Sequence, residues 1–145
     1  MDGWGWVRVG AVLGFLAVAF GAFGAHGLKA RLDGLGTAAN FQTAVQYHMY
    51  HALALLALGP IAMFRPGTPV SVAGWSFLVG VMVFSGSLYL LSVTGLKWLG
   101  AVTPIGGVAM LVGWVALAVA ASGSASGVGW TAYPTLKVER TEDRP

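Results

Sequence analysis

The chain has 145 residues, of which 57% are hydrophobic and only 9% charged, and it contains 22 glycines and no cysteine. Soluble domains carry about 25% charged residues, so this composition, with a mean hydropathy of +0.75, excludes an ordinary soluble fold and indicates a membrane protein. The net charge of +3 comes from basic residues scattered singly along the chain, which argues against nucleic acid as a partner and leaves the lipid bilayer as the expected one.

Four apolar runs are each long enough to cross a bilayer, which takes roughly 20 residues. The first is longer than the apolar core of a signal peptide, about 7 to 15 residues, which is the competing interpretation of this segment. A polar stretch at 27–40 follows it, which we expect to be a connecting loop with at most one interfacial turn. The predicted spans are residues 6–27, 43–64, 70–94 and 98–121.

These runs predict an all-α fold, an integral membrane antiparallel four-helix bundle formed by residues 1–121. Residues 122–145 combine a small polar linker with a charged segment, so we predict that they form a disordered tail. Four spans use more than half of the chain, which leaves no room for a separate catalytic domain. Any chemistry must therefore take place among the helices.

The orientation follows from basic residues near the helix ends, which favour the cytoplasmic side. With the N-terminus inside, the cytoplasmic side holds one basic residue more than the other side, so we predict that both termini are cytoplasmic. In either orientation, the first and third loops lie on the same face. The compared residues are Arg8, Arg65, Lys137 and Arg140 on one side and Lys29, Arg31 and Lys97 on the other.

Small residues recur on one face of the first and fourth runs. In lipid, close backbone approach through such residues supplies much of the attraction between helices. Whether the two faces meet within one chain or between protomers of a homo-oligomer stays open. Pro104, with the Gly106–Gly107 pair, is expected to kink the fourth helix. The predicted helix-packing glycines are Gly10, Gly14, Gly21, Gly24, Gly106 and Gly113.

Polar side chains within the spans gather in one half of the bilayer. His26 closes the first run, while His48 and His51 lie in the opening turns of the second, one turn apart on one face. We therefore predict a pocket open toward the first and third loops, in which His26 and His51 approach one another or share a water or solute. The alternative for each residue is structural, as an interfacial ring or a hydroxyl bonded to its own helix. The predicted pocket residues are His26, Tyr47, His51, Ser85, Ser87, Tyr89 and Thr103.

Five short motifs resemble the successive signatures of one known family, in the right order over residues 7–120. The chain resembles the small bacterial membrane proteins catalogued as domain of unknown function four hundred and twenty-three, a grouping with animal mitochondrial relatives. The resemblance implies a four-helix protein of the inner (plasma) membrane with no established activity. Where family members often have glutamine, this chain has His48, which weakens any mechanism that requires this histidine. The motifs are GAFGAHG at 21–27, YHMYHA at 47–52, FSGSLY at 84–89, TPIGG at 103–107 and GW at 113–114.

Three classes of function are compatible with these features. The first, which we favour, is a structural or accessory component of a membrane assembly that uses its glycine faces as partner surfaces. The second is a pocket that handles a small solute, a proton or a lipid, lined by His26, His51, Ser85 and Tyr89. The third, a metal or haem site, is disfavoured because the spans contain no Asp, Glu or Cys to complete a ligand shell. We expect no cofactor and no enzymatic activity, since paired carboxylates, a phosphate-binding loop and a nucleophile elbow are missing from the sequence.

Overall fold

The computed structural model describes residues 1–122, which form five α-helices and one 3-10 helix and contain no β-strand. Ser122 is the last residue of helix α5, and the rest of the tail predicted at 122–145 lies outside the described residues. The elements in chain order are α1 (Gly3–Ala25), α2 (Lys29–Leu35), α3 (Ala38–Phe64), α4 (Thr68–Thr94), the 3-10 helix η1 (Lys97–Ala101) and α5 (Thr103–Ser122).

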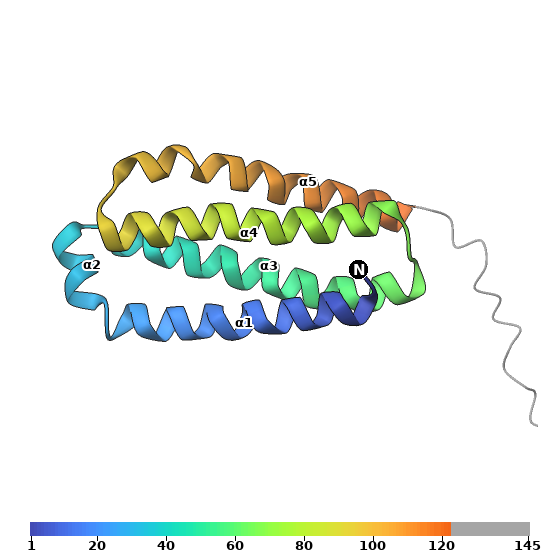
Figure 1. The fold of residues 1–145 in the computed structure, drawn as a ribbon, viewed down its shortest axis with the longest axis horizontal. Helices are drawn as coiled ribbons and strands as arrows, with labels where there is room; N and C mark the ends of the chain where they lie inside the picture. Colours follow the sequence, from blue (N-terminus) through green and yellow to red (C-terminus); the bar gives the residue numbers. More distant parts are fainter. Residues whose placement is uncertain (123–145) are drawn as a thin grey trace, which may run out of the picture.

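Four segments are long and apolar enough to cross a membrane, namely α1, α3, α4 and η1 together with α5. They contain 23, 27, 27 and 26 residues, which at 1.5 Å per residue gives about 35 to 40 Å. This length matches a hydrocarbon core of about 30 Å with its interfaces. Figure 1 shows these segments side by side, with successive segments running in opposite directions. The prediction of an all-α fold with four helical segments long and apolar enough to span a membrane is confirmed for the described residues.

The helices form two close pairs, α1 with α3 and α4 with α5, which are joined by contact of α3 with α4. Glycines allow the backbones of each pair to approach. A Cβ atom at Gly10 would lie 2.8 Å from the backbone nitrogen of Leu56, and one at Gly106 would meet the backbone of Phe84. Each small-residue face therefore packs on the neighbouring helix of the same chain, and the two faces do not pack on each other.

The other predicted packing glycines differ in their surroundings. Gly24 and Gly113 lie against the rings of Phe41 and Phe77, and a Cβ atom at Gly21 would be 3.3 Å from Val45. Gly14, by contrast, has no neighbouring atom within 4 Å of its Cβ position among the described residues. Gly14 thus has no packing partner at its Cβ position among the described residues, and whether its face packs on another protomer stays a prediction.

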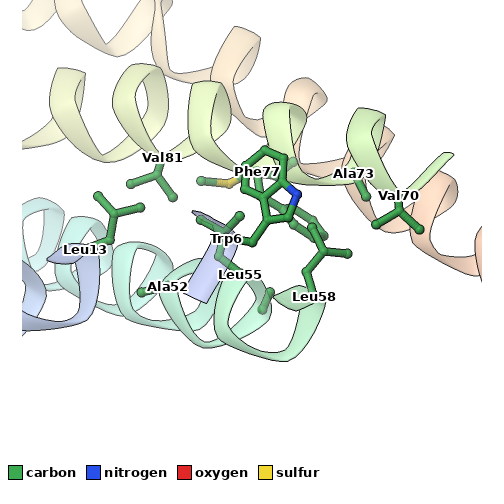
Figure 2. Packing of buried hydrophobic residues seen from close by; sticks show 11 residues of the cluster. Trp6, Leu13, Ala52, Leu55, Leu58, Val70, Ala73, Phe77 and Val81 are labelled. Atoms are coloured by element: carbon green, nitrogen blue, oxygen red, sulfur yellow. The ribbon is translucent and has the colours of Figure 1, made fainter. Parts of the chain in front are cut away.

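A hydrophobic cluster fills the space between α1, α3 and α4 in the half of the bundle that contains the N-terminus (Figures 1 and 2). Trp6 of α1 is fully buried, lies directly over Gly74 of α4 and meets Trp75 edge-on with ring centroids 5.7 Å apart. Figure 2 shows its indole beside Leu55 and Phe77. Trp6 thus closes the gap between α1 and α4 in this half of the molecule.

The connecting loops bind the ends of later helices. The last carbonyl groups of a helix have no partner within the helix itself. At the end of α4 they accept hydrogen bonds from the α2 connector, where Arg31 Nε donates to Val93 O at 3.0 Å and Thr37 Oγ1 donates to Ser92 O at 2.7 Å. At the end of α5, Arg65 donates to the carbonyl of Ala121 at 3.4 Å. The connectors therefore hold together helices that are distant in sequence.

Two predicted features of the spans are corrected by the structure. The second span begins at Ala38, earlier than the expected residue 43, so His51 stands at the centre of α3 and not in its opening turns. The α-helix of the fourth span, α5, begins at Thr103, after the 3-10 turn of η1. Pro104 consequently lies in the first turn of α5, where a helix needs no hydrogen bond from the proline nitrogen, and the expected kink is wrong.

Candidate binding grooves of the helix bundle

The polar side chains of the bundle line two separate grooves. The first, here called the α1–α4 groove, has a volume of about 620 Å³ and lies between α1 and α4 over His48 of α3. The second, the α3–α5 groove, has a volume of about 350 Å³ and lies between α3 and α5 over Phe84 of α4. The single pocket expected from the sequence is therefore divided, with Ser85 and Tyr89 in the first groove and Tyr47 and His51 in the second.

In the α3–α5 groove, both ring nitrogens of His51 have hydrogen-bond partners. The indole nitrogen of Trp114 lies 3.2 Å from Nε2 and can only donate, so Nε2 is the acceptor. Nδ1 then carries the proton and donates to the carbonyl of Tyr47 at 2.8 Å. The imidazole is 4% exposed and packs against the ring of Phe77 at 5.4 Å. His51 thus joins α3 to α5 as a neutral ring with no free nitrogen.

Beside this histidine, Tyr47 forms part of the wall of the α3–α5 groove. Its ring stacks on that of His51 at 6.2 Å and lies 4.6 Å from the ring of Phe84. The side chain is only partly covered, with 40% of its surface exposed. Tyr47 therefore contributes packing and the carbonyl that receives the His51 proton.

In the α1–α4 groove, His48 has one nitrogen with a partner and one without. Its Nδ1 lies 3.3 Å from the hydroxyl of Tyr89, across the contact between α3 and α4. Its Nε2 is buried and has no hydrogen-bond partner among the described residues. His48 is 4% exposed, as buried as His51, so the two histidines differ in their hydrogen bonding and not in their burial.

Ser85 lies in the same groove and has the same unsatisfied character. Its hydroxyl is buried without a hydrogen-bond partner in the part of the chain that the structure describes, although serines in helices commonly bond back to a carbonyl of the previous turn. The rest of the groove is largely apolar, with Leu13, Leu16, Val81 and Leu99 among its lining residues. The lining contains no Asp, Glu, Lys or Arg.

An aromatic side chain from α1 covers the polar pair. The ring of Phe20 lies 4.9 Å from that of Tyr89 and 6.2 Å from that of His48, measured between centroids. Phe20 itself is 38% exposed and lines the groove. The polar atoms of His48 and Tyr89 therefore lie beneath a side chain that is free on its outer face.

Ser87 and Thr103, both predicted as pocket residues, form a hydrogen-bonded pair between α4 and α5. Their hydroxyl oxygens are 2.8 Å apart. Each hydroxyl is also within hydrogen-bonding distance of a backbone carbonyl on the preceding turn, Phe84 O at 3.0 Å for Ser87 and Leu99 O at 3.2 Å for Thr103. Both residues are buried. Their hydrogen-bonding capacity is thus used within the protein, and their role is to connect the helices.

His26 does not join His51, so this part of the predicted pocket is corrected. It is the C-cap residue of α1, is exposed, and is absent from the lining of both grooves. Nearby, Gly24 packs on Phe41, which precedes His51 by ten residues, or about 15 Å along the helix. Since α3 begins five residues earlier than expected, the centre of that helix lies far from the end of α1.

Among the groove residues that were not selected from the sequence as pocket residues, three have rings beside the polar groups: His48, Phe20 and Trp114. His48 and His51 differ by three positions, which rotates them by about 60° around the helix axis. That angle is enough to turn one ring toward α1 and the other toward α5. The α1 wall of the α1–α4 groove could have been predicted from Leu13, Leu16 and Phe20, which recur every three or four residues and so share one side of α1.

The described residues contain no group of three or more His, Cys, Asp or Glu side chains that could hold a metal ion. The three histidines lie in different surroundings, with His26 exposed and the other two in separate grooves. They therefore do not form a common ligand set for a metal or a haem.

The fold and the apolar helices define the class of this molecule: it is a multi-pass α-helical membrane protein. Residues 20–107 match the model of the family described as "Protein of unknown function (DUF423)", and the chain belongs to this family. No solved structure matches it.

Bacterial relatives are similar over most of their length. The "UPF0382 membrane protein YwdK" of Bacillus subtilis is 47% identical over 116 residues, which is 79% of this chain and 94% of the relative. The "UPF0382 membrane protein SAB0533" of Staphylococcus aureus and the "UPF0382 membrane protein SERP0230" of Staphylococcus epidermidis are each 44% identical over 117 residues, 79% of this chain and 92% of the relative. These names describe membrane proteins without an assigned activity, so a more specific function has to be argued from the site.

Proposed function

We propose that this protein binds a lipid-soluble amphiphile, an apolar molecule with one hydrogen-bonding group, in the α1–α4 groove. The observation that carries the proposal is the pair of buried polar atoms, His48 Nε2 and Ser85 Oγ, which have no partner among the described residues. Both residues line the groove. An unsatisfied buried polar group costs roughly 1 to 3 kcal/mol, and a ligand that bonds to both atoms would recover this cost.

The shape and composition of the groove support an apolar ligand body. Its volume of about 620 Å³ falls within the range of roughly 300 to 1,000 Å³ found for small-molecule sites. Its walls come mainly from leucine and valine side chains, together with the ring of Phe20. The groove lies beside α1, which together with α5 has the smallest share of buried residues among the spans. This position fits lateral entry of a ligand from the bilayer.

The hydrogen bonding around Ser85 supports binding and not catalysis. A serine nucleophile requires an adjacent base that accepts its proton. In this structure the Ser85 hydroxyl has no hydrogen-bond partner among the described residues, so none of their basic side chains is hydrogen-bonded to it. We accordingly propose a binding protein without enzymatic activity.

Two glycine variants form a matched test of the groove. Gly86 and Gly14 both have open space at their Cβ positions, but only Gly86 lines the α1–α4 groove. Leucine at position 86 should fill the groove without disturbing the helices. We expect mass spectrometry of lipid-soluble molecules that co-purify in mild detergent to find one species retained by the wild type and by Gly14→Leu, and depleted at least tenfold in Gly86→Leu.

Equal amounts of every co-purifying molecule in the three proteins would contradict ligand binding in this groove. Thermal unfolding of the two variants serves as the control for folding. If the Gly86→Leu protein unfolds at the wild-type temperature, any loss of ligand is due to the filled groove and not to misfolding.

An accessory role in a membrane assembly, the function favoured from the sequence, is a second candidate. It is supported by Gly14 on α1, whose Cβ position has no neighbouring atom within 4 Å in the part of the chain that the structure describes. A partner helix or a second copy could approach there. We expect chemical cross-linking in native membranes to yield a defined complex that Gly14→Leu weakens; a wild-type chain that remains uncross-linked would remove this candidate.

We also propose that the protein lies in the inner membrane with both termini in the cytoplasm. The proposal is supported by the bias of basic residues toward one side. It is also consistent with the contacts that α2, which contains Asp33, and η1, which begins at Lys97, each make with α4. The chain has no cysteine, so single cysteines can be introduced at the exposed positions Asp33 and Pro66. A membrane-impermeant maleimide should label position 33 in intact cells and position 66 only after lysis; the reverse pattern would invert the orientation.

A further inference from the structure

We infer that the polar group of the ligand is an uncharged carbonyl, held by two hydrogen bonds from His48 and Ser85. This inference rests on the proposed binding function and specifies the chemistry of the ligand. It follows from the direction of the available hydrogen bonds, from the absence of charge in the groove lining, and from the depth of the two side chains in the membrane.

The direction of the hydrogen bonds follows from Tyr89. Its hydroxyl carries one hydrogen, and the acceptor that the structure places near it is His48 Nδ1, at 3.3 Å. If the hydroxyl accepted instead, its own hydrogen would be left unpaired among aromatic rings. Tyr89 therefore donates to Nδ1, the proton of the neutral imidazole is on Nε2, and Nε2 becomes a donor toward the ligand.

Ser85 supplies the second donor. Its hydroxyl hydrogen is not engaged by any carbonyl or side chain of the described residues. The N–H donor of His48 on α3 and the O–H donor of Ser85 on α4 thus come from residues that line the same groove. A carbonyl oxygen has two lone pairs and can accept both hydrogen bonds without bringing a hydrogen of its own. A hydroxyl ligand that accepted both would have to place its hydrogen on the lone pairs of a lining oxygen such as Tyr89 Oη, which already donates to His48.

The depth of the site favours a neutral ligand from the membrane interior. Ser85 lies nine residues before Thr94, the end of α4, which corresponds to about 14 Å along the helix. The 27 residues of α4 span about 40 Å, so each end extends roughly 5 Å beyond the hydrocarbon core of about 30 Å. The phosphate of a lipid headgroup lies outside this core and does not reach Ser85. A carboxylate or phosphate at this depth would be costly, and the groove lining contains no basic side chain to pair with it.

Phe20 determines how the ligand reaches its donors. Both donor atoms are covered in the structure, and the Phe20 ring lies over the His48–Tyr89 pair. Since Phe20 is 38% exposed, its ring can swing outward into the lipid when a ligand enters. The ligand is therefore a molecule dissolved in the hydrocarbon core that displaces Phe20 and hydrogen-bonds beneath it.

The experiment uses a long-chain ketone, 9-heptadecanone with a ¹³C carbonyl, and full-length protein in nanodiscs of ether-linked phosphatidylcholine, a lipid without carbonyl groups. Infrared difference spectra should show the ¹³C=O band shifted to lower wavenumber in the wild type. The shift should be partly lost in Ser85→Ala and in His48→Leu, each with a Kd weakened about three- to tenfold. His48→Gln, whose amide can donate, should restore most of the shift. Gly86→Leu should abolish binding.

The possible results separate this inference from the proposed function. Ketone binding that Gly86→Leu abolishes, but with a band unaffected by Ser85→Ala and His48→Leu, would overturn the carbonyl assignment while groove binding stands. Tighter binding of heptadecyl phosphate or heptadecanol than of the ketone would overturn it as well. Ketone binding that disappears in ester-linked phosphatidylcholine would assign the site to lipid esters instead of a dissolved molecule. If none of these probes bound and the co-purified molecules were equal in wild type and Gly86→Leu, the proposed function itself would fail.

Discussion

The grooves formed by α3 with its neighbours differ in how their polar atoms are used. On the α5 side, His51 has a partner at each ring nitrogen. The hydroxyls of Ser87 and Thr103 bond to each other between α4 and α5, although Ser87 also lines the α1–α4 groove. On the α1 side, His48 and Ser85 each keep one buried atom without a partner among the described residues. Burial alone does not separate the two histidines, since each is 4% exposed.

This difference suggests a criterion for functional polar residues inside a membrane protein. A polar side chain whose hydrogen bonds are completed within the chain serves to join helices. One whose hydrogen bonds are incomplete and which also lines a groove can take a partner from outside the chain, because hydrocarbon supplies none. Trp6 Nε1 is buried without a partner as well, but Trp6 lies in the hydrophobic cluster and in neither groove. The α3–α5 groove accordingly belongs to the stability of the bundle, and the α1–α4 groove is the better candidate for binding.

The largest expected effect compares a glycine of each groove region. At Gly113, beneath the His51–Trp114 pair, a Cβ atom would lie 2.6 Å from the Phe77 ring, whereas Gly86 has open space. Gly113→Leu should therefore destabilise the protein by about 3 kcal/mol or more, and Gly86→Leu by less than about 0.5 kcal/mol. Unfolding in mixed micelles by increasing denaturing detergent measures both. Equal losses would show that the two sides are packed alike.

The second effect compares the histidines directly. His51→Leu removes two hydrogen bonds and leaves the Trp114 N–H unpaired, which should cost about 1 to 2 kcal/mol. His48→Leu removes one long contact and a buried unsatisfied atom, so we expect a change within about 0.5 kcal/mol. The same unfolding titration ranks the variants. A His48 variant that is the less stable of the two would reverse the roles assigned to the rings.

The third effect concerns the hydroxyl pair between α4 and α5. Thr103→Val keeps the shape of the side chain but removes the 2.8 Å contact with Ser87. Because hydrogen bonds between membrane helices contribute about 0.6 kcal/mol on average, we expect a loss of that size. Ser87 keeps its bond to Phe84 O at 3.0 Å, which limits the penalty. A double-mutant cycle with Ser87→Ala isolates the pair, and a coupling of zero would exclude it as a link between the helices.

The smallest effect is expected at Tyr89. Tyr89→Phe removes the hydroxyl that lies 3.3 Å from His48 Nδ1 and retains the ring against Phe20 and Phe41. Stability should change by less than about 0.5 kcal/mol. Binding of the ketone probe should weaken, because the proton of His48 is then free to move to Nδ1, away from the ligand. A large loss of stability with unchanged binding would place Tyr89 among the structural residues.

The sequence predicted the helices of this protein well because their signals are local. Long apolar runs bounded by charged or helix-breaking residues define spans, and the expected end at residue 64 coincides with the end of α3. The expected start at residue 43 was late because Asn40 and Gln42 are polar, although both are exposed residues near the start of α3. The kink at Pro104 was expected because the helix was predicted to begin at residue 98. Since α5 begins at Thr103, the proline lies in its first turn and breaks no helical hydrogen bond.

The candidate site was less predictable because it depends on how each helix is rotated about its axis and on which side chains of other helices contact it. The sequence gathers His48, His51, Ser85 and Tyr89 into neighbouring turns, but it does not show which ring faces α1 and which faces α5. Only the packing of Trp114 on His51 and of Phe20 over His48 separates them. An unsatisfied hydroxyl such as that of Ser85 leaves no trace in a sequence, because any serine in a helix could bond to its own backbone.

The hydrogen bonds made by the connectors have a consequence for the order in which the protein assembles. Arg31 and Thr37 precede the α4 carbonyls that they bind, and Arg65 precedes the carbonyl of Ala121 in α5. A ribosome therefore produces each of these donors before the helix end that needs it. When α4 and then α5 leave the translocation machinery, the donors for their terminal carbonyls have already been synthesised. The connectors of the earlier part of the chain can therefore position the ends of the later helices as these pack.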